Sequence, residues 1–127
     1  MISLICFCDG GCNNVTKSNA YGSFKIFSDK EEVLKRTEYN FIKSSNEAEY
    51  QTFMDLLYYI KENFPENIDV KIFSDSMLLV NQVNKRWNVK ADNMLIFNGS
   101  AVNLFNSFDS ISLEWVTRKI IVKQLGH

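Results

Sequence analysis

Apolar and polar residues recur along the chain in two patterns, and the first of them predicts five β-strands. Residues 2–9 are almost wholly apolar and rich in β-forming side chains, so we expect a strand that is buried on both faces and ends at Asp9. Gly10 and Gly11 follow it and allow a sharp turn or a close approach of another group. Apolar residues at roughly alternate positions predict further strands at 20–27, 32–42, 68–75 and 110–116.

The second pattern is helical and is clearest between Ser44 and Pro65. Serine side chains that can act as N-caps open this stretch, and the acids Glu47 and Glu49 follow, where they favour the positive end of a helix dipole. An apolar stripe at helical spacing then continues toward the proline. Further helices are expected at 76–84, at 92–108 with Asp92 as the cap, and as a short helix or tail at 118–127.

This order of elements predicts an α/β fold with a five-stranded mixed sheet. The first three strands follow one another through short loops, so they are expected to form an antiparallel meander. The fourth and fifth strands come after helices and are expected to lie parallel, through right-handed crossovers. The length of 127 residues suits a single domain over 1–127, with helices flanking the sheet.

Composition narrows the class of protein without naming a function. With 46% hydrophobic residues the chain is globular, and no apolar run is long enough to cross a membrane. Its three cysteines do not suggest a disulfide framework, so a reducing, cytoplasmic location is expected. A monomer is expected as well. Cys6, Cys8 and Cys12 could be metal ligands, but the first two fit better as small apolar residues of a buried strand.

The net charge of −1 does not by itself indicate a nucleic-acid-binding protein. Basic residues nevertheless gather in two stretches without acids, 85–90 and 118–123. Such runs are often only solvated surface, and here they remain candidates for a local binding patch.

Carboxylates follow two of the predicted strands, Asp9 after the first and Asp75 after the fourth. The carboxyl ends of neighbouring parallel strands meet at one edge of a sheet, and Glu49 lies early in a helix that can reach the same place. Each acid alone has a simpler explanation. Asp9 could be a turn residue, Asp75 a helix cap, and Glu49 a partner of the helix dipole. Together they need a counter-charge, and Mg²⁺ prefers such oxygen ligands.

Six short segments, spread in order over nearly the whole chain, carry a family resemblance. They are Cys8-Asp9-Gly10-Gly11, Ser44-Ser45-Asn46-Glu47-Ala48-Glu49-Tyr50, Ile72-Phe73-Ser74-Asp75-Ser76, Leu79-Val80-Asn81-Gln82-Val83, Trp87-Asn88-Val89-Lys90 and Trp115-Val116-Thr117-Arg118. Together they resemble the type 1 ribonuclease H family, in the compact form that lacks the basic protrusion. The resemblance implies the ribonuclease H-like fold.

It also implies an endonuclease that hydrolyses the RNA strand of RNA–DNA hybrids with two Mg²⁺ or Mn²⁺ ions. Asp9 would bridge both ions, and Glu49 and Asp75 would complete one ion site. The implied substrate contacts are Gly10, Gly11, Cys12, Asn13 and Asn14 along the RNA strand, Ser44 and Asn46 near the DNA strand, and Trp87, Lys90 and Arg118. Trp87 fits equally well as a core residue.

The tail departs from the family pattern, which has a fourth acid on the last helix. No Asp or Glu follows Glu114 in this chain. His127 could replace that acid as a metal ligand or could be a frayed terminal residue, and Lys123 could place an ammonium near the second ion. Otherwise the site is degenerate, and the protein is a weak or inactive nucleic-acid-binding module. Metal-dependent cleavage of another substrate, such as a DNA junction, also fits the fold.

Overall fold

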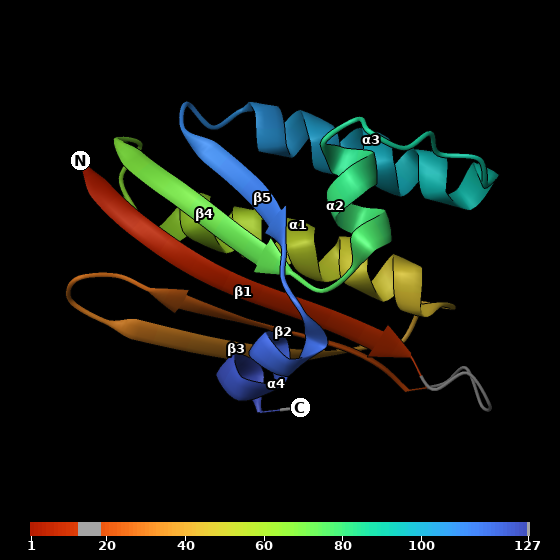
Figure 1. The fold of residues 1–127 in the computed structure, drawn as a ribbon, viewed down its shortest axis with the longest axis horizontal. Helices are drawn as coiled ribbons and strands as arrows, with labels where there is room; N and C mark the ends of the chain where they lie inside the picture. The colour runs from red at the N-terminus through yellow and green to blue at the C-terminus, as the bar shows by residue number, and fades with distance from the viewer. Residues whose placement is uncertain (13–18, 127) are drawn as a thin grey trace.

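A five-stranded sheet forms the centre of the molecule (Figure 1). The computed structural model describes residues 1–12 and 19–126. The strands are β1 (Ile2–Cys12), β2 (Ala20–Phe27), β3 (Glu32–Tyr39), β4 (Ile68–Ser74) and β5 (Ile111–Trp115), in the spatial order β3-β2-β1-β4-β5. Strands β1 to β3 pair antiparallel, whereas β4 lies parallel to both β1 and β5. The predicted meander and parallel crossovers are therefore confirmed.

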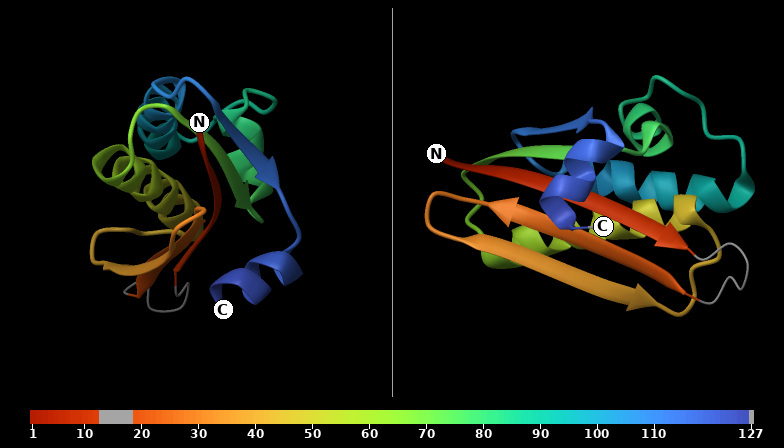
Figure 2. Two further views of the ribbon diagram at one scale, coloured as in Figure 1. Left: turned by 90° about the vertical axis from the view of Figure 1, so that its left-hand side faces the viewer. Right: turned by 60° about the horizontal axis from the view of Figure 1, so that its bottom comes forward.

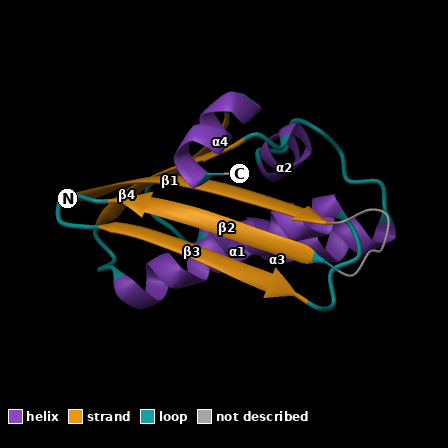
Figure 3. Ribbon diagram, turned by 90° about the horizontal axis from the view of Figure 1, so that it is seen from below, coloured by secondary structure: helices purple, strands orange, loops and turns teal. Residues whose placement is uncertain are grey.

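Helices lie on both faces of this sheet. They are α1 (Ser45–Asn63), α2 (Met77–Val83), α3 (Asp92–Asn106) and α4 (Arg118–Leu125). Helix α1 packs on β1 and β2 with α3 beside it, and the short α4 packs on β1 and β2 from the opposite face (Figures 2 and 3). No helix among residues 1–12 and 19–126 is long and apolar enough to span a membrane.

The main core lies between the sheet and α1. Leu4, Cys6 and Cys8 point from β1 into it and meet fully buried side chains of α1 such as Phe53 and Leu57. Burial of these apolar side chains against each other is what fixes α1 on the sheet. Cys6 and Cys8 are thus core residues, as the strand pattern favoured.

Two expectations about β1 are wrong. The strand does not end at Asp9, because its pairing with β2 continues through Gly10 and Gly11 to Cys12. Its second face is not buried either: Ile5 is 44% exposed, since α4 is too short to cover the whole sheet. A run of apolar residues cannot reveal how much of each face a later helix covers.

Other element ends differ by a few residues. Strand β3 stops at Tyr39 rather than at residue 42, and Ile42 is buried in the connection to α1. Helix α3 ends at Asn106, before the turn that leads into β5. Its N-cap is Ala91, which forms no side-chain cap bond, so Asp92 is the first helical residue rather than the cap. An acid stabilises a helix start from either position, which is why the pattern does not separate them.

The connection between α2 and α3 bears on the family form. Residues 84–91 join the two helices without a further helix, in agreement with the compact form. Lys85, in this loop, is the one described non-glycine residue with a positive φ, at 63°.

Candidate active site

Asp9 and Asp75 come together because β1 and β4 separate just before them. The last parallel pair is Phe7 with Phe73, and each aspartate lies two residues beyond it. A step of two residues keeps a side chain on the same face of a strand, so both carboxylates lie on the face that carries Phe7 and Phe73. The predicted convergence of the two aspartates is a direct result of this register.

Glu49 reaches the same point from α1. The helix begins where the hydroxyl of Ser44 accepts a hydrogen bond from the backbone N–H of Glu47, which places Glu49 in the next turn. The Oε2 atom of Glu49 accepts a bond of 3.1 Å from the N–H of Gly10. This approach requires glycine, because a Cβ at position 10 would lie 2.5 Å from the carbonyl atoms of Ala48.

The three acids form one carboxylate cluster: Asp9, Glu49 and Asp75. Each offers an oxygen, and these oxygens all lie within 4.8 Å of one another. Asp9 is only 1% exposed. Burial, followed by the charges of Asp9 and Asp75, raises the pKa of Glu49 to about 9, although the Gly10 hydrogen bond opposes the shift. Carboxylate oxygens at this spacing suit a hard divalent cation such as Mg²⁺ or Mn²⁺.

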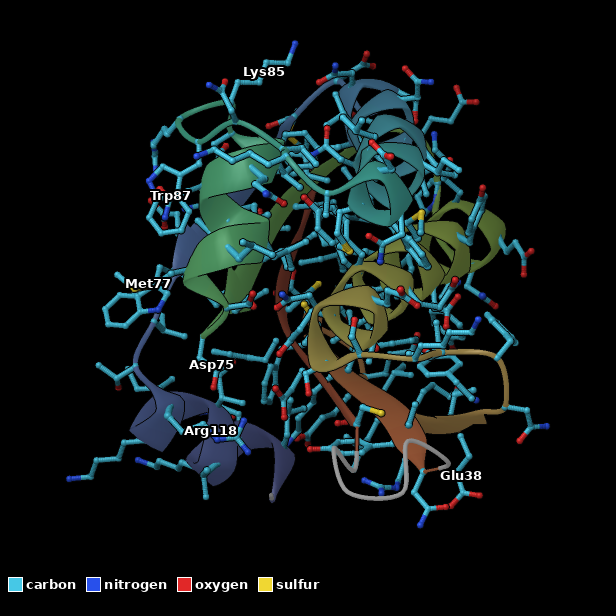
Figure 4. All side chains as sticks on the ribbon, turned by 90° about the vertical axis from the view of Figure 1, so that its right-hand side faces the viewer. Glu38, Asp75, Met77, Lys85, Trp87 and Arg118 are labelled. Atoms are coloured by element: carbon cyan, nitrogen blue, oxygen red, sulfur yellow. The ribbon has the colours of Figure 1, made fainter. Side chains whose placement is uncertain are left out.

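Arg118 joins the carboxylate cluster from α4. Its Nη1 atom donates to Oδ2 of Asp9 at 2.9 Å and to Oδ2 of Asp75 at 3.1 Å. Figure 4 shows the Arg118 side chain directed toward Asp75. These bonds, the one to Asp9 above all, raise the pKa of the Arg118 guanidinium above its usual value. The resemblance placed Arg118 among the substrate contacts, so its direct contact with the carboxylates is new information from the structure.

Two further residues at the cluster were missed by the sequence analysis. The indole Nε1 of Trp115 donates to the backbone oxygen of Asp75 at 3.1 Å. Tyr21 lies on β2 opposite Gly11, and its hydroxyl is hydrogen-bonded by Arg118. Neither contact could be read from a pattern, because both depend on which residues the sheet places side by side.

Several substrate-contact candidates lie at the end of β1 and at the start of α1. Gly10, Gly11 and Cys12 occupy the end of β1 next to the carboxylate cluster. At the start of α1, Ser44 uses its hydroxyl as the helix cap and Asn46 is exposed.

The loop of residues 84–91 holds two further candidates, Trp87 and Lys90. Trp87 is 47% exposed, so the core alternative for it is wrong, and Lys90 is exposed as well. Lys123 lies on α4 with an exposed side chain. Asn13, Asn14 and His127 lie outside the described residues, so the roles suggested for them stay predictions.

Comparison with known proteins decides the family. The RNase H family model matches residues 2–119. The chain belongs to the RNase H family. This membership confirms the predicted class of enzyme, a ribonuclease H. No curated protein sequence matches the chain significantly.

Solved RNase H structures share the fold of this family member. RNase H1 of Halobacterium salinarum has a TM-score of 0.84 at 19% identity, covering 97% of this chain and 93% of that one. The N-terminal RNase H domain of a Mycobacterium tuberculosis protein has a TM-score of 0.79 at 22% identity, covering 98% and 91%. LC11-RNase H1 in complex with an RNA/DNA hybrid has a TM-score of 0.75 at 17% identity, covering 96% and 92%.

Proposed function

We propose that this RNase H family member is a metal-dependent endoribonuclease that hydrolyses the RNA strand of RNA–DNA hybrids. The observation that carries the proposal is the carboxylate cluster, with three oxygens within 4.8 Å of one another where β1 and β4 separate. The similarity to LC11-RNase H1, whose structure was solved with an RNA/DNA hybrid, supports the choice of substrate.

The residues of the cluster fit divalent cations because their ligand atoms are all carboxylate oxygens. Asp9, Glu49 and Asp75 would hold the metal. A bound Mg²⁺ or Mn²⁺ supplies a more acidic water and stabilises the charge on the leaving oxygen. The family resemblance implies two ions, with Asp9 shared between them. How many ions bind depends on the charge of the whole cluster, and Arg118 contributes to that charge.

The chain's own groups would orient the reaction. The N–H of Gly10 holds Oε2 of Glu49, and the indole of Trp115 holds the backbone of Asp75, so two of the three acids are fixed before substrate arrives. Fixed ligands reduce the rearrangement that the reaction requires. Nothing in this arrangement requires a covalent intermediate, and water is the nucleophile.

Basic and aromatic side chains offer a path for the substrate. In Figure 4, Lys85, Trp87, Met77, Asp75 and Arg118 follow one another down one side of the molecule. Met77 and Trp87 are 52% and 47% exposed, as expected for residues that contact a ligand surface. Contacts with the sugar–phosphate backbone carry no sequence information, so cleavage would be largely independent of sequence. The 2′-hydroxyl groups that distinguish RNA would lie near the end of β1.

The test is a cleavage assay on a labelled RNA–DNA hybrid with Mg²⁺ and, separately, with Mn²⁺. Double-stranded RNA, double-stranded DNA and a DNA junction serve as control substrates. Cutting of the RNA strand in the hybrid alone would support the proposal, and preferred cutting of a control substrate would contradict it. A cytoplasmic location and a monomeric state stay predictions from the sequence.

One observation favours a second candidate, a catalytically weak module that binds hybrids. The α4 segment contains no acid, so the fourth acid of the family pattern is missing from it. A binding module would give no cleavage with either metal but would keep salt-sensitive binding to the hybrid. Mn²⁺-stimulated cleavage that disappears in His127→Ala would instead support an enzyme in which His127 replaces the missing acid.

A further inference from the structure

The contact of Arg118 with the carboxylate cluster has the form of a bridging cation. One nitrogen, Nη1, lies 2.9 Å from Oδ2 of Asp9 and 3.1 Å from Oδ2 of Asp75. A metal ion held by these two carboxylates would lie near the guanidinium, and two cations repel each other strongly at a site of low dielectric. Asp9 is 1% exposed, so its charge has little water to offset it and depends on its neighbours.

The guanidinium is held in this place from a second side. The Tyr21 hydroxyl accepts a hydrogen bond from Arg118, and the Tyr21 ring is itself covered by the Arg36 guanidinium at 4.6 Å from the ring centroid. Tyr21 also lies directly opposite Gly11, where a Cβ would come within 2.8 Å of its ring. The close packing of this ring fixes the hydroxyl, and the hydroxyl in turn favours one position of Arg118.

The charges of the site then limit how many ions it can take. Carboxylates that hold a metal ion must be ionised, so the three acids would then carry three negative charges. The Arg118 guanidinium, which stays protonated, offsets one of these charges. One divalent ion balances the remainder. A second divalent ion would leave two excess positive charges at a largely buried site, which is unfavourable at low dielectric.

We propose that Arg118 is a built-in positive charge of this site, so that each chain binds one divalent ion rather than the two that the family resemblance implies. Arg118 is therefore a positioning residue for Asp9 and Asp75 that also weakens metal binding. This inference rests on the proposed metal site, and it assigns that site a stoichiometry and a resident cation.

The test counts bound Mn²⁺ on the full chain without nucleic acid, by calorimetric titration and by the electron paramagnetic resonance signal of free Mn²⁺, at pH 8. The wild type is expected to bind one ion. Arg118→Gln removes the competing charge and is expected to bind Mn²⁺ about tenfold more tightly or better. Lys119→Gln makes the same charge change at the next, exposed position of α4 and is expected to bind Mn²⁺ as the wild type does.

Two gentler variants keep the inference testable if Arg118→Gln does not fold. Tyr21→Phe keeps the ring beneath Arg36 but removes the hydroxyl, so it should bind Mn²⁺ more tightly than the wild type by a smaller factor. Arg118→Lys keeps the positive charge and should still bind one ion. A melting curve in EDTA establishes that each variant is folded before its titration is interpreted.

The outcomes separate this inference from the proposed function. Two ions on the wild type, or unchanged Mn²⁺ affinity in folded Arg118→Gln and Tyr21→Phe, would overturn the role of Arg118 while leaving a metal-dependent nuclease in place. If the wild type binds no Mn²⁺, or if Asp9→Asn binds Mn²⁺ as well as the wild type does, the metal site itself is overturned, and the proposed function with it.

Discussion

The properties of single residues in this protein depend strongly on their immediate neighbours. Glu49 is an ordinary helix glutamate in the sequence, yet burial and the charges of Asp9 and Asp75 raise its pKa to about 9. Arg118 would be an ordinary surface arginine, yet its Nη1 contacts both aspartates. The negative charges of Asp9 and Asp75 thus act on both residues, and burial adds to the effect on Glu49.

The first prediction concerns Asp9, the most buried member of the carboxylate cluster. Asp9→Asn removes a metal ligand and one negative charge while keeping the shape of the side chain. We expect cleavage of an RNA–DNA hybrid to fall below detection and the protein to stay folded in EDTA, because the amide oxygen of asparagine can still accept the hydrogen bond from Arg118. Cleavage at the wild-type rate by a folded Asp9→Asn protein would rule out the metal-site model.

The second prediction concerns pH and Glu49. Between the ordinary pKa of 4.5 and the folded-state value of about 9, the folded protein holds a proton that the unfolded chain has released. The free energy of unfolding in EDTA therefore decreases as the pH rises through this window. The measurement is the denaturant midpoint at pH 5, 7 and 9. Glu49→Gln cannot titrate, so its midpoint should depend less on pH, and equal slopes for the two proteins would contradict the shift.

At the scale of elements, the site depends on how closely α1 approaches β1. Gly10 makes this approach possible, since its missing Cβ leaves room for the carbonyl group of Ala48. The same approach brings the Gly10 N–H to Glu49. The strand and the helix are thus joined at the one place where the carboxylates must meet.

The third prediction compares two glycines. Gly10→Ala forces β1 and α1 apart and should destabilise the fold by about 1–3 kcal/mol, with a loss of Mn²⁺ affinity. Gly99→Ala, in the exposed interior of α3 with nothing within 4 Å of the added Cβ, should stabilise it by about 0.5–1 kcal/mol. Urea denaturation measures both. Equal effects of the two substitutions would show that the close approach at Gly10 is not tight.

At the scale of the whole molecule, charge is distributed unevenly. The net charge is −1, so the protein as a whole does not attract a polyanion. Nucleic-acid binding must therefore come from a local patch, and the exposed basic residues of the loop after α2, with Trp87 among them, form the leading candidate. Figure 4 places Lys85 and Trp87 on the side of the molecule that carries Asp75.

The fourth prediction uses salt to count the charges of this patch. In an Asp9→Asn background, which prevents cleavage, neutralising Lys85, Arg86 and Lys90 to Gln should reduce the slope of log K against log[salt] by up to about 3. Trp87→Ala should weaken hybrid binding without changing the slope, because it removes no charge.

Lys61→Gln is the control for this experiment, since Lys61 lies near the end of α1 and covers the Phe108 ring away from the carboxylate cluster. It should leave both affinity and slope unchanged. A triple variant with the wild-type slope would place the binding patch elsewhere.

Sequence patterns alone predict the order of the elements and the meeting of Asp9 with Asp75. Both follow from short-range information: alternation and helical spacing define each element, and a crossover through a helix makes β1 and β4 parallel. The patterns do not predict the exposure of a side chain where that exposure depends on a neighbour distant in the sequence. The exposure of Ile5 depends on the length of α4, and the exposure of Trp87 depends on what packs over its loop.

The contacts that complete the carboxylate cluster arise only in the folded molecule. Gly10 and Glu49 are 39 residues apart in the sequence, and Asp9 and Arg118 are 109 apart. No local pattern encodes such contacts, because they form only when the sheet sets the register of its strands and α4 folds back across it. The residue types required for a metal site are therefore written in the sequence, whereas the positive charge that balances part of that site is a product of the fold.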